Sequence, residues 1–196
     1  MGSFKHLKKS KNARLGKVIS PLNEKLKNIE WGEFKIEDLF DVNTSKSFDE
    51  GKLDLYNTQS DYMFEFIGRT ANNNGIKGYV EKLDIEPNSG DVISISQIGT
   101  IVAQIRKNKW YASQNIFILK PKNKKNISLY INSSINSALN KNYSSGYSNY
   151  PTLLKLKKLH IYLPIKNKKI DFEFMESFIA ELEAYLLATG LKDYVL

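Results

Sequence analysis

The chain has no cysteine and only two histidines among its 196 residues. Without cysteine there is no disulfide bond, no cysteine-ligated zinc and no thiol nucleophile. His6 and His160 are too few for a metal centre built from several histidines, so the sequence predicts no metal site. His160 stands between Leu159 and Ile161 in an expected strand, where a histidine that packs at the core or the sheet edge is favoured over a catalytic one.

Long apolar runs and catalytic signatures are also missing. No apolar stretch approaches the ~18 residues of a membrane-spanning helix, and residues 1–11 lack the apolar segment of a secretory signal. The sequence contains no Gly-rich phosphate loop followed by Lys-Ser/Thr, no Asp/Asn-Pro-Pro-aromatic motif of adenine methyltransferases and no persuasive Asp-Glu-Lys nuclease set. We therefore expect a cytoplasmic protein without a membrane segment, and predict no catalytic residue.

Arginine is rare, because only three of the 29 cationic residues are arginines: Arg14, Arg69 and Arg106. The formal net charge of +8 favours a polyanionic partner, above all nucleic acid. A lysine-rich proteome would give the same charge without such a partner. The hydrophobic fraction of 41% is enough for a packed core, and the length fits one large domain, or one domain with an appendage.

The most informative segment is FIGRTANNNGIKGYV, residues 66–80. Its apolar ends are expected to belong to two strands, and the residues between them are hydrogen-bonding groups that cannot form a core. Such groups can bind phosphates and read base edges. Alternatively, the asparagines occupy left-handed positions beside Gly75 and cap their own turn as scaffold. The DNA-binding candidates in this segment are Arg69, Thr70, Asn72, Asn73, Asn74 and Lys77.

Three further polar segments are candidates for the same interface. Lys46 lies in a long polar segment, residues 43–61, of a kind that is often functional in compact domains. Residues 106–109, RKNK, are expected to form a basic hairpin tip that contacts phosphates or is merely solvated. Residues 140–151 carry tyrosines that contact phosphates, stack on a flipped base or pack beneath the loop. The candidates in the last two segments are Arg106, Lys107, Lys109, Tyr143, Ser144, Tyr147 and Asn149.

Hydrophobic periodicity predicts an α+β fold. A helical turn over residues 36–40 leads into a strand at Phe40, and a helix is expected over residues 128–139. A last strand, residues 159–163, is expected to stop at Pro164. Short β-branched runs predict three more strands, over residues 92–98, 101–105 and 116–120. We expect these strands to form a twisted, partly barrel-like sheet with flanking helices.

The last segment has the spacing of a coiled-coil-type helix. Asp171 is a plausible N-cap, and the apolar positions that follow are spaced three and four residues apart. This seam docks either on the chain's own domain or, as we favour, on a helix of another chain. The predicted interface residues are Phe172, Met175, Ile179, Leu182 and Leu186, with Phe178 and Tyr185 widening the seam.

Four segments in order resemble the DNA specificity subunit of type I restriction–modification systems. WGEFKIEDLFDV is similar to the family's usual entry, and FIGRTANNNGIKGYV to its most characteristic internal block. NYSSGYSNYPTLLKLKKLHIYLP resembles the closing block, and DFEFMESFIAELEAYL the start of the spacer helix. The resemblance covers residues 31–196. It implies a target recognition domain over residues 31–168 and a helical spacer or dimerisation segment over residues 169–196.

The resemblance also implies partners and cofactors. The chain would bind double-stranded DNA and direct methyltransferase and nuclease/translocase subunits to it, and would bind no cofactor itself. S-adenosylmethionine, ATP and magnesium would belong to those partner subunits. Family members carry two recognition domains, so one domain predicts a half-subunit that forms a homodimer, or a fragment.

Two other functions remain open. The chain is alternatively the recognition region of a fused methyltransferase–nuclease, or a basic module of unrelated role that binds nucleic acid or protein. Residues 1–30, which are basic and weakly amphipathic, are interpreted as a loosely ordered arm. This arm is either functional or a cloning-derived leader.

Overall fold

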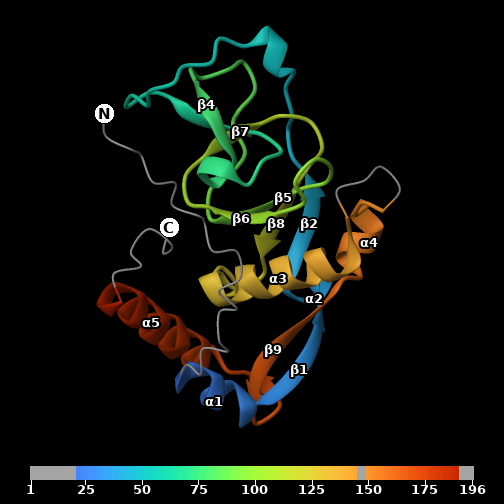
Figure 1. Ribbon diagram of the computed structural model, residues 1–196. Coiled ribbons are helices and arrows are strands. Elements are labelled where there is room, and N and C mark those ends of the chain that lie inside the picture. Colours follow the sequence, from blue (N-terminus) through green and yellow to red (C-terminus); the bar gives the residue numbers. More distant parts are fainter. Residues whose placement is uncertain (1–20, 145–148, 190–196) are drawn as a thin grey trace, which may run out of the picture.

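The computed structural model describes residues 21–144 and 149–189. Its centre is a four-stranded antiparallel sheet (Figure 1). Every residue of strand β5 is buried, because the strand lies inside the sheet and its Val and Ile side chains face packed layers. In spatial order the strands are β2 (Phe40–Thr44), β8 (Ile116–Pro121), β5 (Val92–Ser96) and β6 (Ala103–Arg106), which confirms the expected strands.

A second sheet lies at one end of the molecule and carries the polar block (Figure 1). Strand β3 (Phe64–Ile67) pairs antiparallel with β4 (Ile76–Val80) and parallel with β7 (Trp110–Ala112). The register between β3 and β4 shifts at a bulge between Phe66 and Ile67. The short 3-10 helix η2 (Asn72–Gly75) connects β3 to β4, so the block forms a hairpin that projects from a buried base.

A third sheet lies at the opposite end (Figure 1). Strand β1 (Glu30–Lys35) and strand β9 (His160–Lys166) form an antiparallel ribbon, and β10 (Lys169–Ile170) pairs with β9. The expected stop at Pro164 is wrong, because β9 continues to Lys166. The carbonyl oxygen of Pro164 accepts a hydrogen bond from the Asp171 backbone N–H over 2.9 Å, so this proline serves the ladder as an acceptor only.

The helices close the core between the central sheet and the ribbon (Figure 1). Helix α3 (Leu129–Asn142) begins at Ser128, whose Oγ accepts from the Ile131 N–H over 3.2 Å. Residues 153–157, just before the expected last strand, form the short helix α4 (Leu153–Lys157), capped by Thr152. The other short elements are α1 (Pro21–Lys27), α2 (Ile36–Leu39), η1 (Glu50–Lys52) and η3 (Lys124–Asn126).

Helix α5 (Phe172–Ala188) begins at Asp171, whose Oδ1 accepts from the Phe174 N–H over 3.0 Å, as the sequence predicts. Our preference for a seam that faces another chain is wrong for the first half of this helix. Met175 is buried in the chain's own core, and Phe178 packs against Tyr130 of α3 with the two rings edge-on. Three more side chains from the first half of α5 pack on the same core: Phe172, Phe174 and Ile179.

The second half of α5 is less covered. Leu182 and Leu186 are half-buried, whereas 40% of Tyr185 is exposed. Glu181 forms an ion pair with Lys25 of α1, which lies beside this helix.

Within the described residues, no helix is both long enough and apolar enough to cross a membrane. The α+β class is confirmed, although the sheets stay open and form no closed barrel.

Candidate nucleic-acid interface

The Asn triplet combines a structural role with exposed side chains. Asn73 and Asn74 both have φ of 47°, and Gly75 follows with φ of 78°, so three successive residues are left-handed. Asparagine tolerates this conformation better than most residues. Nδ2 of Asn73 donates to the Ile76 carbonyl over 3.3 Å, and its side chain therefore caps the turn. Asn72 and Asn74 are exposed, and their side chains bond to no other described residue.

Arg106 supports this turn from inside. Only 1% of its surface is exposed, and its Nε donates to Ser94 Oγ over 2.9 Å. Its Nη2 donates to Gln104 Oε1 over 2.6 Å. Burial lowers the pKa of Arg106 to about 10, an effect that the Glu65 carboxylate partly offsets. A Cβ at Gly75 would lie 2.5 Å from Gln104 Oε1, which explains why glycine stands there.

The prediction that Arg106 belongs to an exposed basic tip is therefore wrong. Its position in strand β6 points it toward Ser94 of the neighbouring strand, away from solvent. Lys107 and Lys109 are exposed in the turn between β6 and β7, as predicted for a tip. Lys46 is exposed too, and its Nζ donates to the Glu86 carbonyl over 3.0 Å.

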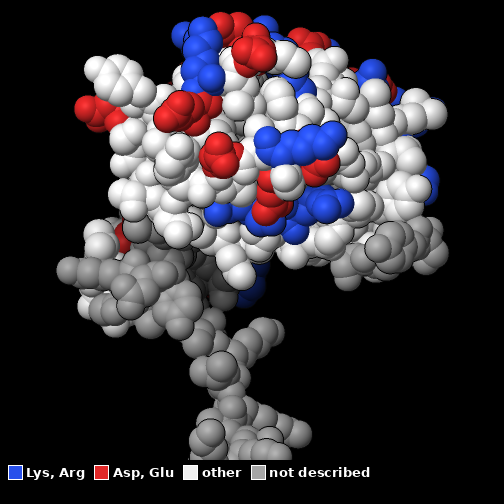
Figure 2. Space-filling view, turned by 90° about the horizontal axis from the view of Figure 1, so that it is seen from above, with Lys and Arg blue, Asp and Glu red and all other residues white. Residues whose placement is uncertain are grey.

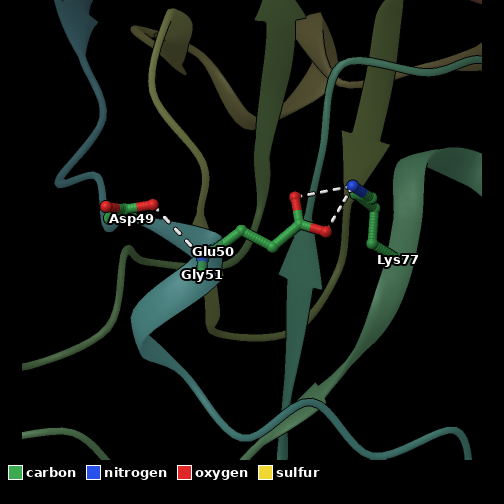
Figure 3. Close-up of polar contacts among 4 residues, drawn as sticks. All are labelled: Asp49, Glu50, Gly51 and Lys77. Carbon is green, nitrogen blue, oxygen red and sulfur yellow. Dashed lines mark hydrogen bonds and ion pairs between the residues drawn. The ribbon is translucent and has the colours of Figure 1, made fainter.

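Lys77 is held by an acidic residue from the long polar segment (Figure 3). Its Nζ donates to both carboxylate oxygens of Glu50, over 2.6 Å to Oε2. Glu50 begins η1, which Asp49 caps by accepting from the Gly51 N–H over 3.2 Å. The aliphatic stem of Lys77 crosses Gly68 so closely that a Cβ there would lie 2.3 Å from Cδ of Lys77.

A small pocket of about 170 Å³ opens beside this ion pair. Arg69 is exposed at its rim, and Ser113 contributes a buried Oγ that has no hydrogen-bond partner among the described residues. Thr70 Oγ1 already accepts from the Asn72 N–H over 3.1 Å. The lining residues are Glu50, Gly68, Arg69, Thr70, Lys77 and Ser113. The structure thus brings together two predicted cations that are eight positions apart in sequence.

The charge around this end of the molecule is mixed. Figure 2 looks onto it from above and shows Lys and Arg side chains interspersed with Asp and Glu. Glu50 pairs with Lys77, and Glu86 pairs with Lys82 over 2.7 Å. These pairs reduce the net positive field of the face. Any polyanion that binds here would therefore meet individual cations, because the described residues of this face mix both signs of charge.

The second polar loop is only partly described. Tyr143 is half-buried against the core, and this burial raises the pKa of its hydroxyl. The Ser144 N–H donates to the Asn149 carbonyl over 3.0 Å, and Nδ2 of Asn149 donates to the Asn142 carbonyl over 3.1 Å. Tyr147 lies outside the described residues. The described residues on either side of 145–148 are therefore joined by hydrogen bonds, and Tyr143 packs against the core rather than projecting.

A groove of about 710 Å³, which the sequence analysis did not predict, lies along α3. Trp31 and Tyr162 are exposed there on adjacent strands, and Tyr162 donates to Glu33 Oε1 over 2.7 Å. Its lysines, Lys141, Lys155 and Lys158, form no ion pair with another described residue. These residues come from β1, α3, α4 with its C-cap, and β9, so only the run LKLKKLH hinted at them. Among the described residues no cluster of three His, Cys, Asp or Glu could hold a metal ion.

The geometry defines a class of protein: an α+β domain that presents polar hairpin side chains at one end and carries helix α5 after strand β10. More particularly, the chain belongs to the type I restriction modification DNA specificity domain family, whose family model matches residues 28–189. This match confirms the resemblance drawn from the four sequence segments.

Known relatives agree with this assignment. The specificity subunit S.BcgI of a type II restriction enzyme from Heyndrickxia coagulans is 29% identical over 158 residues. The match covers 79% of this chain and 44% of that relative, so the chain spans less than half of that protein's length.

Solved structures share the fold at low sequence identity. The S subunit of a type I restriction-modification system from M. genitalium has a TM-score of 0.58 at 15% identity, covering 83% of this chain and 41% of that one. A chain from a structural study of complex assembly and conformational transition of the type I system has a TM-score of 0.60 at 12% identity, covering 88% and 45%. The HsdS subunit from Thermoanaerobacter tengcongensis has a TM-score of 0.54 at 12% identity, covering 83% and 39%.

Proposed function

We propose that this chain reads a specific sequence of double-stranded DNA within a restriction–modification complex, and directs methyltransferase and nuclease/translocase subunits to that site. Catalysis, with S-adenosylmethionine, ATP and magnesium, would belong to those partner subunits. The complex would work in the cytoplasm, where the DNA is.

The observation that carries this proposal is the hairpin between β3 and β4. It packs a left-handed turn against a buried arginine, while Arg69, Asn72 and Asn74 stay exposed. An amide can pair bidentately with adenine and a guanidinium with guanine, and each such pair is worth about 1–3 kcal/mol of discrimination. Lys77, Lys107 and Lys109 supply cations for neighbouring phosphates.

We further propose that the outer half of α5 contacts another chain. Two half-buried leucines, Leu182 and Leu186, flank the exposed Tyr185 there. A second copy that docks through this short seam would place two recognition domains on a symmetric, split target. A helix of a partner subunit would use the same residues.

Methylome mapping of a host that carries this system tests the proposal. A sequence motif whose methylation appears with the gene and disappears on its deletion supports the function. The critical variant is Asn74→Gly, which keeps the left-handed turn but removes the amide. We expect this variant to weaken or change the methylated motif, and an unaltered motif at unaltered occupancy would remove Asn74 from the base-reading set.

A further inference from the structure

The pocket beside Lys77 has the composition of an anion site. Two cations, Arg69 and Lys77, line it, and Ser113 adds a buried hydroxyl without a hydrogen-bond partner among the described residues. A buried hydroxyl that lacks a partner is uncommon and calls for an explanation. An incoming oxyanion would supply the acceptor that this hydroxyl lacks. The volume of about 170 Å³ is roomy enough for one phosphate group.

The pocket already contains an anion, the carboxylate of Glu50. Its two oxygens accept from Nζ of Lys77, which is the contact a phosphate would make (Figure 3). Side-chain exposure is 40% for Lys77 and 38% for Glu50. Ion pairs at such exposure contribute little to stability and are screened by salt. A polyanion can therefore displace this carboxylate at small cost.

We propose that this pocket binds one phosphate of the DNA backbone, and that Glu50 occupies it in the free protein as an intramolecular competitor. The proposal rests on the DNA-binding function proposed above and adds a device to it. Because Glu50 must be displaced, random DNA gains less from Lys77 than it otherwise would. A target duplex meets the same displacement cost, so Glu50 lowers the affinity of the pocket for DNA in general, and the preference for the target is left to the base-reading side chains.

The test compares Glu50→Gln with the whole wild-type chain in binding to a random-sequence duplex. We expect the variant to bind about two- to fivefold more tightly at low salt, with a slope of log K against log salt that is steeper by about 0.9. Glu24→Gln is the matched control, because it changes the charge equally in the exposed Glu24–Lys27 pair of α1, at the other end of the molecule (Figure 1). Equal effects of the two variants would overturn the proposal.

A double-mutant cycle isolates the mechanism. Lys77→Met removes the ammonium but keeps an aliphatic stem over Gly68. In this background Glu50→Gln should have no effect beyond that of Glu24→Gln, since the cation it releases is gone. A Glu50→Gln gain that persists without Lys77 contradicts the competition. Glu50→Ala provides a second variant if the amide itself disturbs η1.

Inorganic phosphate separates the pocket from the DNA function. In amide NMR spectra, phosphate should shift the Gly68 and Ser113 resonances at a lower concentration in Glu50→Gln than in wild type. No difference between the two proteins overturns the pocket. If the wild type binds no duplex at all, the proposed function fails, whereas the phosphate titration still decides whether Glu50 blocks an anion site.

Discussion

Nη2 of Arg106 donates a hydrogen bond to Oε1 of Gln104 over 2.6 Å, and Gly75 packs directly against this pair. Nε2 of Gln104 in turn donates to the Thr70 carbonyl over 3.4 Å. Gln104, which accepts from the buried arginine, thus contacts both ends of the turn that carries the Asn triplet. The role of Arg106 is to support the recognition hairpin from behind, whereas Arg69 projects into solvent from the same hairpin.

Arg106→Met should therefore reduce stability rather than DNA contact. The substitution leaves Ser94 Oγ and Gln104 Oε1 without their donor in the interior, which costs about 1–3 kcal/mol for a buried group left unpaired. Urea denaturation measures this loss of unfolding free energy. Lys107→Met is the matched control, because Lys107 is exposed and its loss should stay within about 0.5 kcal/mol. Equal stability of the two variants would show that the hydrogen bonds of the buried guanidinium do not contribute to the unfolding free energy.

Arg69→Ala should reduce DNA binding and leave stability unchanged. Arg69 is exposed, so the melting temperature should not change, but binding to duplex DNA should weaken. If its partner is a guanine, the loss is about 1–3 kcal/mol and depends on sequence. If its partner is a phosphate, the salt slope falls by about 0.9 for every sequence alike. Fluorescence anisotropy at two salt concentrations distinguishes a guanine contact from a phosphate contact. Unchanged affinity would mean that Arg69 makes no contact with DNA.

Asn73→Gly and Asn74→Gly should separate the two roles of the triplet. Glycine accepts the positive φ of both positions, so neither backbone is strained. The Asn73 variant loses the cap on the Ile76 carbonyl and should lose about 0.5–1.5 kcal/mol of stability. The Asn74 variant should keep its stability and lose DNA affinity. The same pattern in both variants, measured by thermal melting and duplex titration, would mean that the triplet has a single role.

Leu182→Asp should abolish self-association or subunit capture while leaving the domain folded. Leu182 is only half-buried, whereas Met175, two turns earlier, is 1% exposed in the chain's own core. Met175→Asp places an unpaired charge there and should unfold the protein. Analytical ultracentrifugation with circular dichroism tests both variants. A Leu182→Asp protein that assembles like wild type would rule out the outer half of α5 as an interface.

Tyr130 gives a pH dependence with a defined sign. Burial raises the pKa of its hydroxyl from 10.0 to about 12, so the neutral form is favoured in the fold. The folded state keeps this proton between pH 10 and 12 while the unfolded state loses it, so stability falls as pH rises through that window. Tyr130→Phe keeps the ring contacts with Phe174 and Phe178 but has no hydroxyl to ionise. The stability of this variant therefore does not fall in that window through residue 130. Its stability relative to wild type should be constant below pH 10 and increase above; a constant difference up to pH 12 contradicts the raised pKa.

The elements that could be predicted were those with a strong local signal. A short β-branched run indicated β5, and Ser128 and Asp171 indicated the starts of α3 and α5. Strand β1 was missed because its partner, β9, lies about 130 positions later, and Trp31 and Phe34 carry no strand pattern of their own. The pairing of distant segments is set by tertiary contacts, which cannot be inferred from local patterns in a single sequence.

The candidate site shows the same limit more sharply. Arg106 and Lys107 are neighbours in one basic run, yet one is buried and the other exposed, because only Arg106 faces Ser94 of the adjacent strand. The Glu50–Lys77 pair joins residues 27 positions apart, and no motif announces it. The hairpin itself was identifiable because its polar composition cannot form a core.

In the proposed function, exposed side chains of the β3–β4 hairpin read the DNA sequence. The most direct measurement titrates the chain with a duplex that carries the mapped target and with a scrambled duplex of equal composition, each at 50 and 200 mM salt. We predict a preference for the target of at least about a thousandfold that survives at the higher salt, while binding to the scrambled duplex collapses. Equal affinity for both duplexes, lost equally with salt, would contradict the account.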